Sequence, residues 1–393
     1  MKIAGIIAEY NPFHTGHAYH IAQTRKLTGA DGVAVIMSGN FVQRGGPAVA
    51  DKWVRARAAV AGGADVVFEL PVCFAHAPAQ IFATGAVQSF EKSGCIDALS
   101  FGVEEERFLE FAEKIISAEA CIEEELKSML TEQIPYPVAY AAAVNKVCDM
   151  PEAFLSTPNN MLALEYVKAL AKMKSTIKPY AVLRAGAGYH EHTEREGYVS
   201  ATAMRSFMEV GDDSWLQYMP QLAANIYKEA KEKNRFPVTE KQFDAAMLSV
   251  LRRMPAEAFA DIADMPQGFE NRIVQMARQA TSIEELCALC NTKQYTSARV
   301  RRLIWNCFLD VHCVDGAAEP EYLRVLAFNE KGRAILKKMK ETCSIPLVIK
   351  AADALQNSSF LTDVRATDLY FAAALQAENR RGGRDYRSAP EQL

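Results

Sequence analysis

The feature that most constrains this chain is an unbroken apolar segment near its start, followed at once by a loop that contains proline. Residues 3–8 show no alternation of polar and apolar side chains, which is typical of a parallel strand buried on both faces. Pro12 cannot donate a backbone hydrogen bond, so the strand must end before it. Thr15 is a suitable N-cap for a helix that continues to about Leu27. The chain therefore opens with a strand, a loop and a helix.

Two histidines, His14 and His17, stand one turn apart at the start of the expected helix, with Gly16 between them. The free N–H groups and the positive dipole end of a helix start bind anions, most often phosphate, and glycine lets a ligand approach the backbone. The pattern is similar to the HxGH motif of nucleotidyltransferases, in which two imidazoles stabilise charge on the phosphates of ATP. Capping or surface histidines are the alternative. His20 is either a third polar group of the site or an ordinary helix residue.

Three more apolar segments predict strands that are buried on both faces. They span residues 32–37, 65–70 and 96–101, and glycine or proline follows each within two residues. Helical patterns near residues 51–61 and 79–92 separate them. Strands and helices that alternate at this spacing predict an α/β fold, built on a parallel sheet with right-handed crossovers.

Ligands of parallel α/β sheets bind beyond the carboxyl ends of the strands. By that rule, the residues that follow the predicted strands should surround one crevice: His14, residues 38–43, Glu69 and Gly102. Gly102 either contacts a nucleotide through its backbone or forms a plain turn. We expect the glycine-rich segment 41–47 to be a mobile loop near this crevice.

The later pattern predicts a helical insertion and then a second domain. Residues from about 104 to 155 are acidic and helical in pattern, which indicates an insertion of two or three amphipathic helices. A helix opens at 158–160, where two asparagines either cap it or bind a base or ribose, and a strand follows at 176–183. Beyond about residue 211 the periodicity is helical and no strand is expected. We therefore predict two domains, residues 1–210 and residues 211–393.

A second group of residues typical of an anion site opens a later helix. Ser200 and Thr202 supply two hydroxyls, and Arg205 follows one turn after them. A guanidinium and the N–H groups of a helix start can converge on one phosphate. An ordinary capped surface helix is the alternative. Together with His14 and His17, these three residues are predicted to form the catalytic set.

The net charge of −4 argues against a protein that coats nucleic acid, and no DNA binding is expected. The charges are uneven, however. Residues 1–210 hold 19 Lys and Arg against 24 Asp and Glu, and residues 211–393 hold 25 against 24. One segment of the second half gathers four cations, Lys293, Arg299, Arg301 and Arg302. They predict a platform for an RNA backbone, with a solvated cationic helix face as the alternative.

The composition fits a globular protein with a sizeable core, since half of the residues are hydrophobic and 23% are charged. No apolar run approaches the length of about eighteen residues that a membrane span needs, and no signal peptide is evident. We therefore expect a cytoplasmic protein without membrane association. The nine cysteines predict reduced thiols. Cys287 and Cys290 form a lone CxxC pair, so no metal site built from protein ligands is predicted.

Several stretches together resemble one family. They are residues 8–17, 37–45, 64–71, 100–102, 158–160, 186–190, 200–202 and 295–296. The chain resembles, nearly from end to end, the tRNA(Met) cytidine acetate ligase family, bacterial enzymes of the HxGH nucleotidyltransferase superfamily. The resemblance implies a Rossmann-like, HUP-type parallel sheet with a helical insertion, followed by an all-α C-terminal domain that binds tRNA.

By this resemblance, the protein would activate acetate with ATP, giving acetyl-adenylate and pyrophosphate. It would then transfer the acetyl group to N4 of the wobble cytidine of elongator tRNA(Met). The implied ATP contacts are Ile7, Ala8, Glu9, Tyr10, Asn11, Pro12, Phe13, His14, Thr15, Gly16, His17, His20, Gly102, Asn159 and Arg184. Mg²⁺ is expected on the phosphates. Such chemistry needs a phosphate clamp and a positioned carboxylate, but no protein nucleophile.

Three other functions remain open from the sequence. A small-molecule adenylyltransferase would use the same phosphate site, but the large helical region with its basic segment speaks against it. The intact His14 and His17 pair and the second motif speak against a non-catalytic nucleotide sensor or RNA-binding module. An amino-acid ligase resembling the tRNA synthetases would need a lysine loop of the KMSKS type, which is absent.

Overall fold

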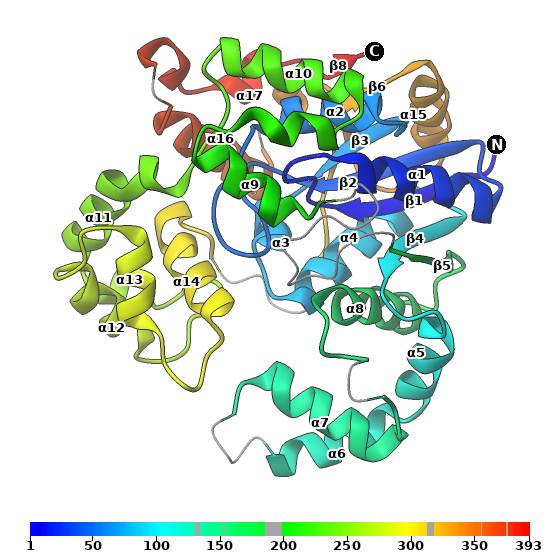
Figure 1. The fold of residues 1–393 in the computed structure, drawn as a ribbon, viewed down its shortest axis with the longest axis horizontal. Coiled ribbons are helices and arrows are strands. Elements are labelled where there is room, and N and C mark those ends of the chain that lie inside the picture. Colours follow the sequence, from blue (N-terminus) through cyan, green and yellow to red (C-terminus); the bar gives the residue numbers. More distant parts are fainter. Residues whose placement is uncertain (130–133, 152–153, 185–198, 313–317, 355, 375) are drawn as a thin grey trace.

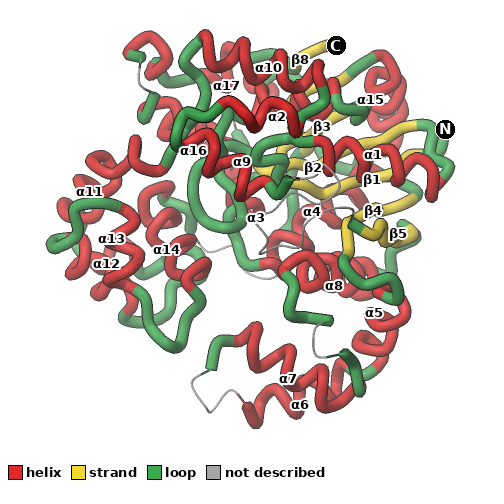
Figure 2. The backbone as a smooth tube through the Cα atoms, viewed as in Figure 1, coloured by secondary structure: helices red, strands yellow, loops and turns green. Residues whose placement is uncertain are grey.

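Five parallel strands form the centre of the protein, in the order β5-β4-β1-β2-β3. The structure is a computed structural model, and it describes residues 1–129, 134–151, 154–184, 199–312, 318–354, 356–374 and 376–393. Figures 1 and 2 show the sheet crossing the molecule, with helices on both sides of it. The predicted α/β fold with a parallel sheet is confirmed.

Within the described residues, eight strands form one sheet. The strands are β1 (Ile3–Ala8), β2 (Gly32–Ser38), β3 (Val66–Leu70), β4 (Ala98–Val103), β5 (Lys178–Leu183), β6 (Leu323–Phe328), β7 (Leu347–Val348) and β8 (Glu391–Gln392). The helices are α1 (Thr15–Thr28), α2 (Lys52–Ala61), α3 (Val72–Ala75), α4 (Ala79–Ser93), α5 (Phe108–Ser117), α6 (Glu119–Met129), α7 (Tyr136–Cys148), α8 (Pro158–Lys172), α9 (Ala201–Glu209), α10 (Gln221–Glu232), α11 (Asp244–Arg253), α12 (Phe269–Ala277), α13 (Ile283–Cys290), α14 (Ser297–Leu309), α15 (Glu330–Thr342), α16 (Ser358–Ala372) and α17 (Arg384–Arg387).

Side chains along β1, β2 and β3 alternate between two hydrophobic layers. From β2, Val33, Val35 and Met37 enter the layer that α1, α2 and α9–α14 cover, whereas Ala34 and Ile36 enter the layer under α4, α8 and α15. Both faces of the sheet are therefore buried. This explains why the strands appear in the sequence as unbroken apolar segments.

One strand of the sheet comes from the C-terminal half of the chain. β6 pairs antiparallel with β3, with Phe68 opposite Val325, and β7 and β8 pair with β6. The predicted helical character of this half is confirmed by α10 to α16. The prediction of an all-α region is wrong, because the six residues of β6 are buried against the edge of β3. The predicted domain boundary near residue 211 stays a prediction.

The acidic segment after β4 forms three helices, α5, α6 and α7, as predicted for the insertion. Figure 1 shows α6 and α7 at the bottom of the view, away from the sheet. A cluster of helices, α11 to α14, lies on the other side of the molecule from α5. Among the described helices, none has the length and apolarity that crossing a membrane would require.

Four charged side chains are buried between the sheet and the end of the chain. Lys52 Nζ lies 2.7 Å from Glu69 Oε2 and 2.9 Å from Asp385 Oδ1. Arg324 Nη2 lies 3.0 Å from the same Asp385 oxygen. None of the four side chains is more than 4% exposed. This ion cluster joins α2, β3, β6 and α17. Glu69, which the sequence predicted beside the ligand crevice, is instead buried in this cluster.

We predict that Lys52→Met destabilises the protein by about 3–5 kcal/mol, because two buried carboxylates would then share only Arg324. The measurement is urea unfolding of the variant and the wild type. The matched control is Lys92→Met, which removes an ion pair between partly exposed Lys92 and Glu319 and should cost about 1 kcal/mol or less. Equal effects of the two substitutions would show that the buried cluster does not hold the fold together.

Candidate active site

The candidate active site lies where the chain reverses its direction across the sheet. From β1 the chain proceeds outward to β2 and β3, and it then returns to β4 on the other side of β1. Loops that leave β1 and β4 therefore diverge, and such a point is where open α/β sheets bind their ligands. The loop 9–14 leaves β1 here and enters α1, and Gly102 lies on the adjacent β4.

His14 is the N-cap of α1. Its Nδ1 accepts a hydrogen bond from Gly16 N at 3.1 Å, and its own backbone N–H donates to His17 Nδ1 at 3.2 Å. The two imidazoles stack with their centroids 3.7 Å apart. The prediction of Thr15 as the cap is wrong, because an imidazole nitrogen takes the place of the usual cap oxygen and Thr15 becomes the first helical residue.

These hydrogen bonds determine where the protons of the two rings lie. An Nδ1 that accepts from a backbone N–H carries no proton, so each neutral ring holds its proton on Nε2. Within the described residues, neither Nε2 of His14 nor that of His17 donates to another protein group. Two Nε2–H donors are thus available beside the positive end of α1, which is an arrangement that suits a phosphate.

The histidines of α1 are held neutral. Burial lowers the pKa of His14 to about 3, and the positive charge of Arg184 lowers it in the same sense. Burial, and then the charge of Arg184, likewise lower the pKa of His20 to about 4. The pKa of His17 lies well below its usual range, because of burial first and then of the neighbouring His14, Arg184 and His20.

His20 connects α1 to β4 across the crevice. Its Nε2 lies 3.1 Å from Ser100 Oγ, and the same hydroxyl lies 2.7 Å from Thr24 Oγ1. The ring thereby connects the second turn of α1 to the middle of β4. Its role as an ATP contact stays a prediction.

Arg205 joins the second predicted motif to the first. Ser200 caps α9 by accepting from Ala203 N, and Arg205 Nη2 donates to Thr202 Oγ1 at 3.0 Å. Arg205 Nη1 donates to the backbone oxygen of Asn11 at 2.8 Å, across 194 residues of sequence. The two motifs predicted to act together therefore lie together. Their catalytic roles stay predictions.

Gly102, Asn159 and Arg184 are neighbours at the ends of β4 and β5. A Cβ atom on Gly102 would lie 3.3 Å from Arg184 Cγ, so glycine leaves room for that side chain. Arg184 Nη1 lies 3.4 Å from Asn159 Oδ1, and Asn159 Nδ2 donates to Glu104 Oε1 at 2.5 Å. The three implied ATP contacts form one cluster. The stretch 186–190 lies outside the described residues.

The glycine-rich loop, residues 41–47, is fixed to α14. Arg301 Nε donates to Gly45 O at 3.0 Å, and Arg302 Nη1 to Gln43 O at 3.3 Å. Gly45 has φ +89°, and a Cβ atom there would lie 3.0 Å from Arg302 N, so this position requires glycine. The prediction of a mobile loop is wrong, because these contacts and its buried residues hold it in place.

The loop in turn contacts the predicted ATP segment, since Gln43 N donates to Glu9 Oε1 at 2.8 Å. The predicted RNA contacts differ in their surroundings. Lys293 is exposed, whereas Arg299 pairs with Asp264 at 2.6 Å and Arg301 pairs with Glu240 at 2.6 Å. Arg302 is buried at 8% exposure. RNA binding by these four residues stays a prediction, and the three arginines also have partners within the protein.

Three residues that support the site were missed in the sequence. Glu104 follows β4 directly, so the rule about carboxyl ends of strands could have found it. Tyr227 lies on α10, and its hydroxyl oxygen accepts from Phe13 N at 3.1 Å. Arg55 on α2 donates to Glu9 O at 2.6 Å. The last two lie on helices far from the motifs, and no local pattern singles them out.

Three buried hydroxyl groups at this edge of the sheet have no partner among the described residues: Tyr10 Oη, Thr15 Oγ1 and Ser38 Oγ. Buried polar groups are normally hydrogen-bonded, so these hydroxyls are candidates for contact with a ligand or with water. No group of three or more His, Cys, Asp or Glu side chains that could hold a metal occurs in the described part of the chain.

Comparisons with known proteins identify the family. The model of the HIGH Nucleotidyl Transferase family matches residues 1–385. A tRNA(Met) cytidine acetate ligase of Acetivibrio thermocellus is 34% identical over 412 aligned positions, which cover 98% of both chains. One from Clostridium perfringens is 35% identical over 94% of this chain and 95% of its own. The chain belongs to the tRNA(Met) cytidine acetate ligase family.

Solved structures of the family share the fold. Thermotoga maritima TmcAL bound with alpha-thio ATP superposes with a TM-score of 0.90 at 30% identity, and its apo form with 0.91 at 31%, each over 100% of both chains. The family resemblance drawn from the sequence is confirmed.

The glycine-rich loop supplies a test through His76. Its Nε2 accepts from Gly46 N at 3.1 Å, so Nδ1–H donates to Asn306 Oδ1 at 2.7 Å. Burial lowers the pKa of His76 to about 3, below the value of about 6.5 in the unfolded chain. As the pH falls, His76 is therefore protonated in the unfolded state before it is protonated in the folded state. Below pH 6.5 this residue should lower the free energy of unfolding by up to about 1.4 kcal/mol per pH unit.

His76→Gln keeps an acceptor for Gly46 N and does not titrate. We expect its stability, measured by urea unfolding between pH 6.5 and pH 4, to depend less steeply on pH than that of the wild type. The same substitution at an exposed histidine, His312→Gln, is the control for the exchange of histidine for glutamine itself. An unchanged slope in His76→Gln would mean that His76 does not resist protonation in the folded protein.

Proposed function

We propose that this protein is an ATP-dependent acetate ligase that acetylates N4 of the wobble cytidine of elongator tRNA(Met), with acetyl-adenylate as the intermediate. The names of its relatives support the substrates, and the ATP analogue in the Thermotoga maritima TmcAL structure supports the nucleotide. One observation carries the proposal. Arg205 binds the loop that leads into the histidine pair, so the two predicted phosphate motifs lie side by side.

The site has the groups that adenylation needs. A carboxylate attacks the α-phosphate of ATP, and negative charge on the leaving pyrophosphate must be stabilised. The Nε2–H groups of His14 and His17, the start of α1 and the guanidinium of Arg205 would supply fixed donors to that charge. Their positions are set before ATP binds, by the helix cap and by the contact with Asn11. No protein nucleophile is required.

Mg²⁺ is the expected companion of the triphosphate. Such an ion is held chiefly by phosphate oxygens and water. Glu104, whose Oε1 accepts from Asn159, is a carboxylate beside this cluster of implied ATP contacts. It could bind a water molecule of the hydrated ion.

In the second step, the RNA must present an exocyclic amine to the acetyl group. We propose Lys293 as a phosphate contact, because it is exposed. Arg299, Arg301 and Arg302 are proposed with it, although their partners Asp264, Glu240 and Gln43 limit how far they can turn toward RNA. An enzyme acting on tRNA works in the cytoplasm, and we propose that location.

The decisive experiment is exchange between ATP and pyrophosphate, measured without RNA across a panel of small carboxylates. We expect acetate to support the exchange, since adenylation is reversible and needs only ATP and the acid. Exchange without any carboxylate, or only with a phosphorylated metabolite, would contradict the ligase function and favour a small-molecule adenylyltransferase.

We predict that His14→Asn lowers the acetate-dependent exchange by roughly a hundredfold to a thousandfold, the range for losing one fixed donor to developing charge. Asparagine is a good N-cap, so it can still accept from Gly16 N while it removes the Nε2–H group. His17→Asn should act in the same way, because its side-chain oxygen can accept from His14 N.

The matched control is Ser282→Asn, which exchanges one helix cap for another at the start of α13. It should exchange at the wild-type rate. If His14→Asn, folded and as stable as the control, also kept the wild-type rate, then His14 would be only a helix cap.

A further inference from the structure

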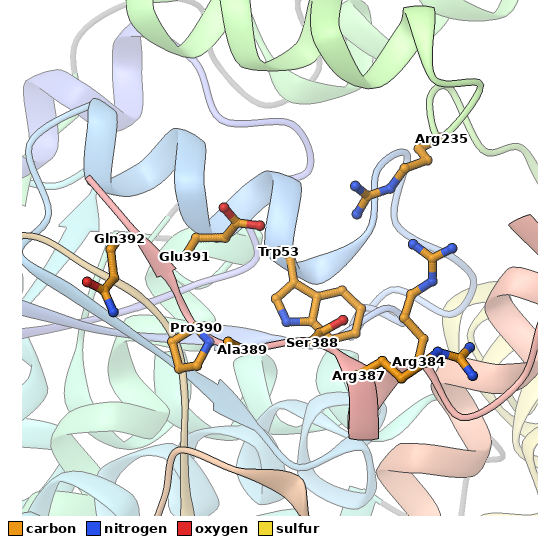
Figure 3. A pocket seen from close by; sticks show the side chains of 9 residues that line it. All are labelled: Trp53, Arg235, Arg384, Arg387, Ser388, Ala389, Pro390, Glu391 and Gln392. Atoms are coloured by element: carbon orange, nitrogen blue, oxygen red, sulfur yellow. The ribbon is translucent and has the colours of Figure 1, made fainter.

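A second cationic pocket lies between α2 and the C-terminal segment. It has a volume of about 500 Å³. Its cations are Arg235, Arg384 and Arg387, and Trp53 lies beside them (Figure 3). The three arginine side chains lie to one side of the indole ring, and Glu391 lies to the other. The pocket uses none of the residues of the candidate active site.

Each guanidinium is held in place but keeps hydrogen-bonding capacity. Arg235 is fixed by the fully buried carboxylate of Asp51, at 2.6 Å. The guanidinium of Arg384 stacks on the ring of Phe371 at 3.8 Å, and its buried Nε has no partner among the described residues. Arg387 Nη2 donates to Gly382 O at 2.7 Å.

Positive charge is in excess in this pocket. Within the described residues, no carboxylate forms an ion pair with Arg384 or Arg387. The carboxylate of the same turn, Asp385, is buried in the ion cluster with Lys52 and Arg324. The ion cluster therefore anchors the segment 384–387. It also keeps Asp385, the one acidic side chain of that segment, away from the pocket.

The basic C-terminal segment is consequently a fixed surface. Gly383 N donates to Asp368 Oδ1 at 2.6 Å, and β8, which contains Glu391, pairs with β6. Fixed guanidinium groups lose less conformational entropy on binding than free ones, and their planar donors match phosphate oxygens.

We propose that this pocket binds the phosphate backbone of the RNA substrate, chiefly through Arg384 and Arg387. The proposal rests on the proposed function, since it takes tRNA as the polyanion. The rim is polar and includes the exposed Arg387 and Gln392, which fits a hydrated phosphodiester chain better than an enclosed small molecule.

The position of the pocket would allow one RNA strand to contact both the pocket and the candidate active site. The first turn of α2 carries both Trp53, which lines the pocket, and Arg55, which binds the loop after β1 through Glu9 O. The pocket and the crevice thus lie on two sides of the same helix start. RNA that places a base in the crevice could pass its backbone over this turn.

The test is binding of a fluorescent transcript of elongator tRNA(Met), followed by anisotropy over a series of salt concentrations. The double variant Arg384→Gln/Arg387→Gln should bind roughly tenfold more weakly at low salt. The slope of log affinity against log salt should fall by about one for each arginine. Acetate-dependent pyrophosphate exchange, measured without RNA, should be unchanged.

Three comparisons make the outcome decisive. Arg107→Gln removes a charge from an exposed pair on the acidic insertion and should change neither affinity nor slope. Arg387→Glu, at an exposed position, should weaken binding without disturbing the stacked Arg384. Arg384→Lys/Arg387→Lys, which keeps the charges, should recover most of the salt slope.

If the double variant and Arg387→Glu both kept the wild-type affinity and salt slope, RNA would not bind at this pocket. The proposed ligase function would not be affected by that result. Loss of exchange together with binding would also overturn RNA binding at this pocket, because the arginines would then be structural. The wild-type protein could also show acetate-dependent pyrophosphate exchange and yet not bind the transcript. That result would contradict both RNA binding at this pocket and elongator tRNA(Met) as the substrate.

Discussion

The arrangement of the site depends on one buried guanidinium, that of Arg55. The chain turns away from the sheet after β1 and after β2, and the carbonyl groups beyond those strands have no strand to pair with. Arg55 is fully buried and donates to Glu9 O, to Ser38 O and Gly39 O, and to Ala50 O. Each such carbonyl, if buried without a donor, would cost about 1–3 kcal/mol. One side chain therefore sets the path of the loops that follow β1 and β2.

How much of this could be predicted from the sequence depends on the range of the interactions. The parallel strands were predictable because burial on both faces leaves an unbroken apolar segment. β6 was missed, since its neighbours in sequence are helical and its partner β3 lies far upstream. The phosphate motifs were found because a helix start is a local feature. The cap was assigned to Thr15 for the same reason, as hydroxyl caps are commoner than the imidazole cap that His14 forms.

For the basic segment around Arg299 and Arg301, the sequence shows the charges but not their partners. The partners of Arg299 and Arg301 lie 35 and 61 residues away in sequence. Composition counts cations and cannot tell which of them are already paired. The structure shows that Arg301 and Arg302 connect the helical region to the glycine-rich loop, and through Gln43 to Glu9.

Under the proposed function, the pairing of cations within the fold also decides where an acidic protein would bind RNA. With a net charge of −4, affinity for a polyanion must come from local groups of cations without acidic partners, because distant charges are screened within about 10 Å at moderate salt. Most cations near the sheet do not meet this condition, since Lys52, Arg324 and Arg235 lie against Glu69, Asp385 or Asp51. Within the described residues, Arg384 and Arg387 do, and the burial of Asp385 is the reason: the fold removes the one acidic side chain of that turn from the surface and leaves the two guanidinium groups on it. The buried ion cluster thus stabilises the sheet and, by the same contacts, gives the C-terminal segment its positive charge.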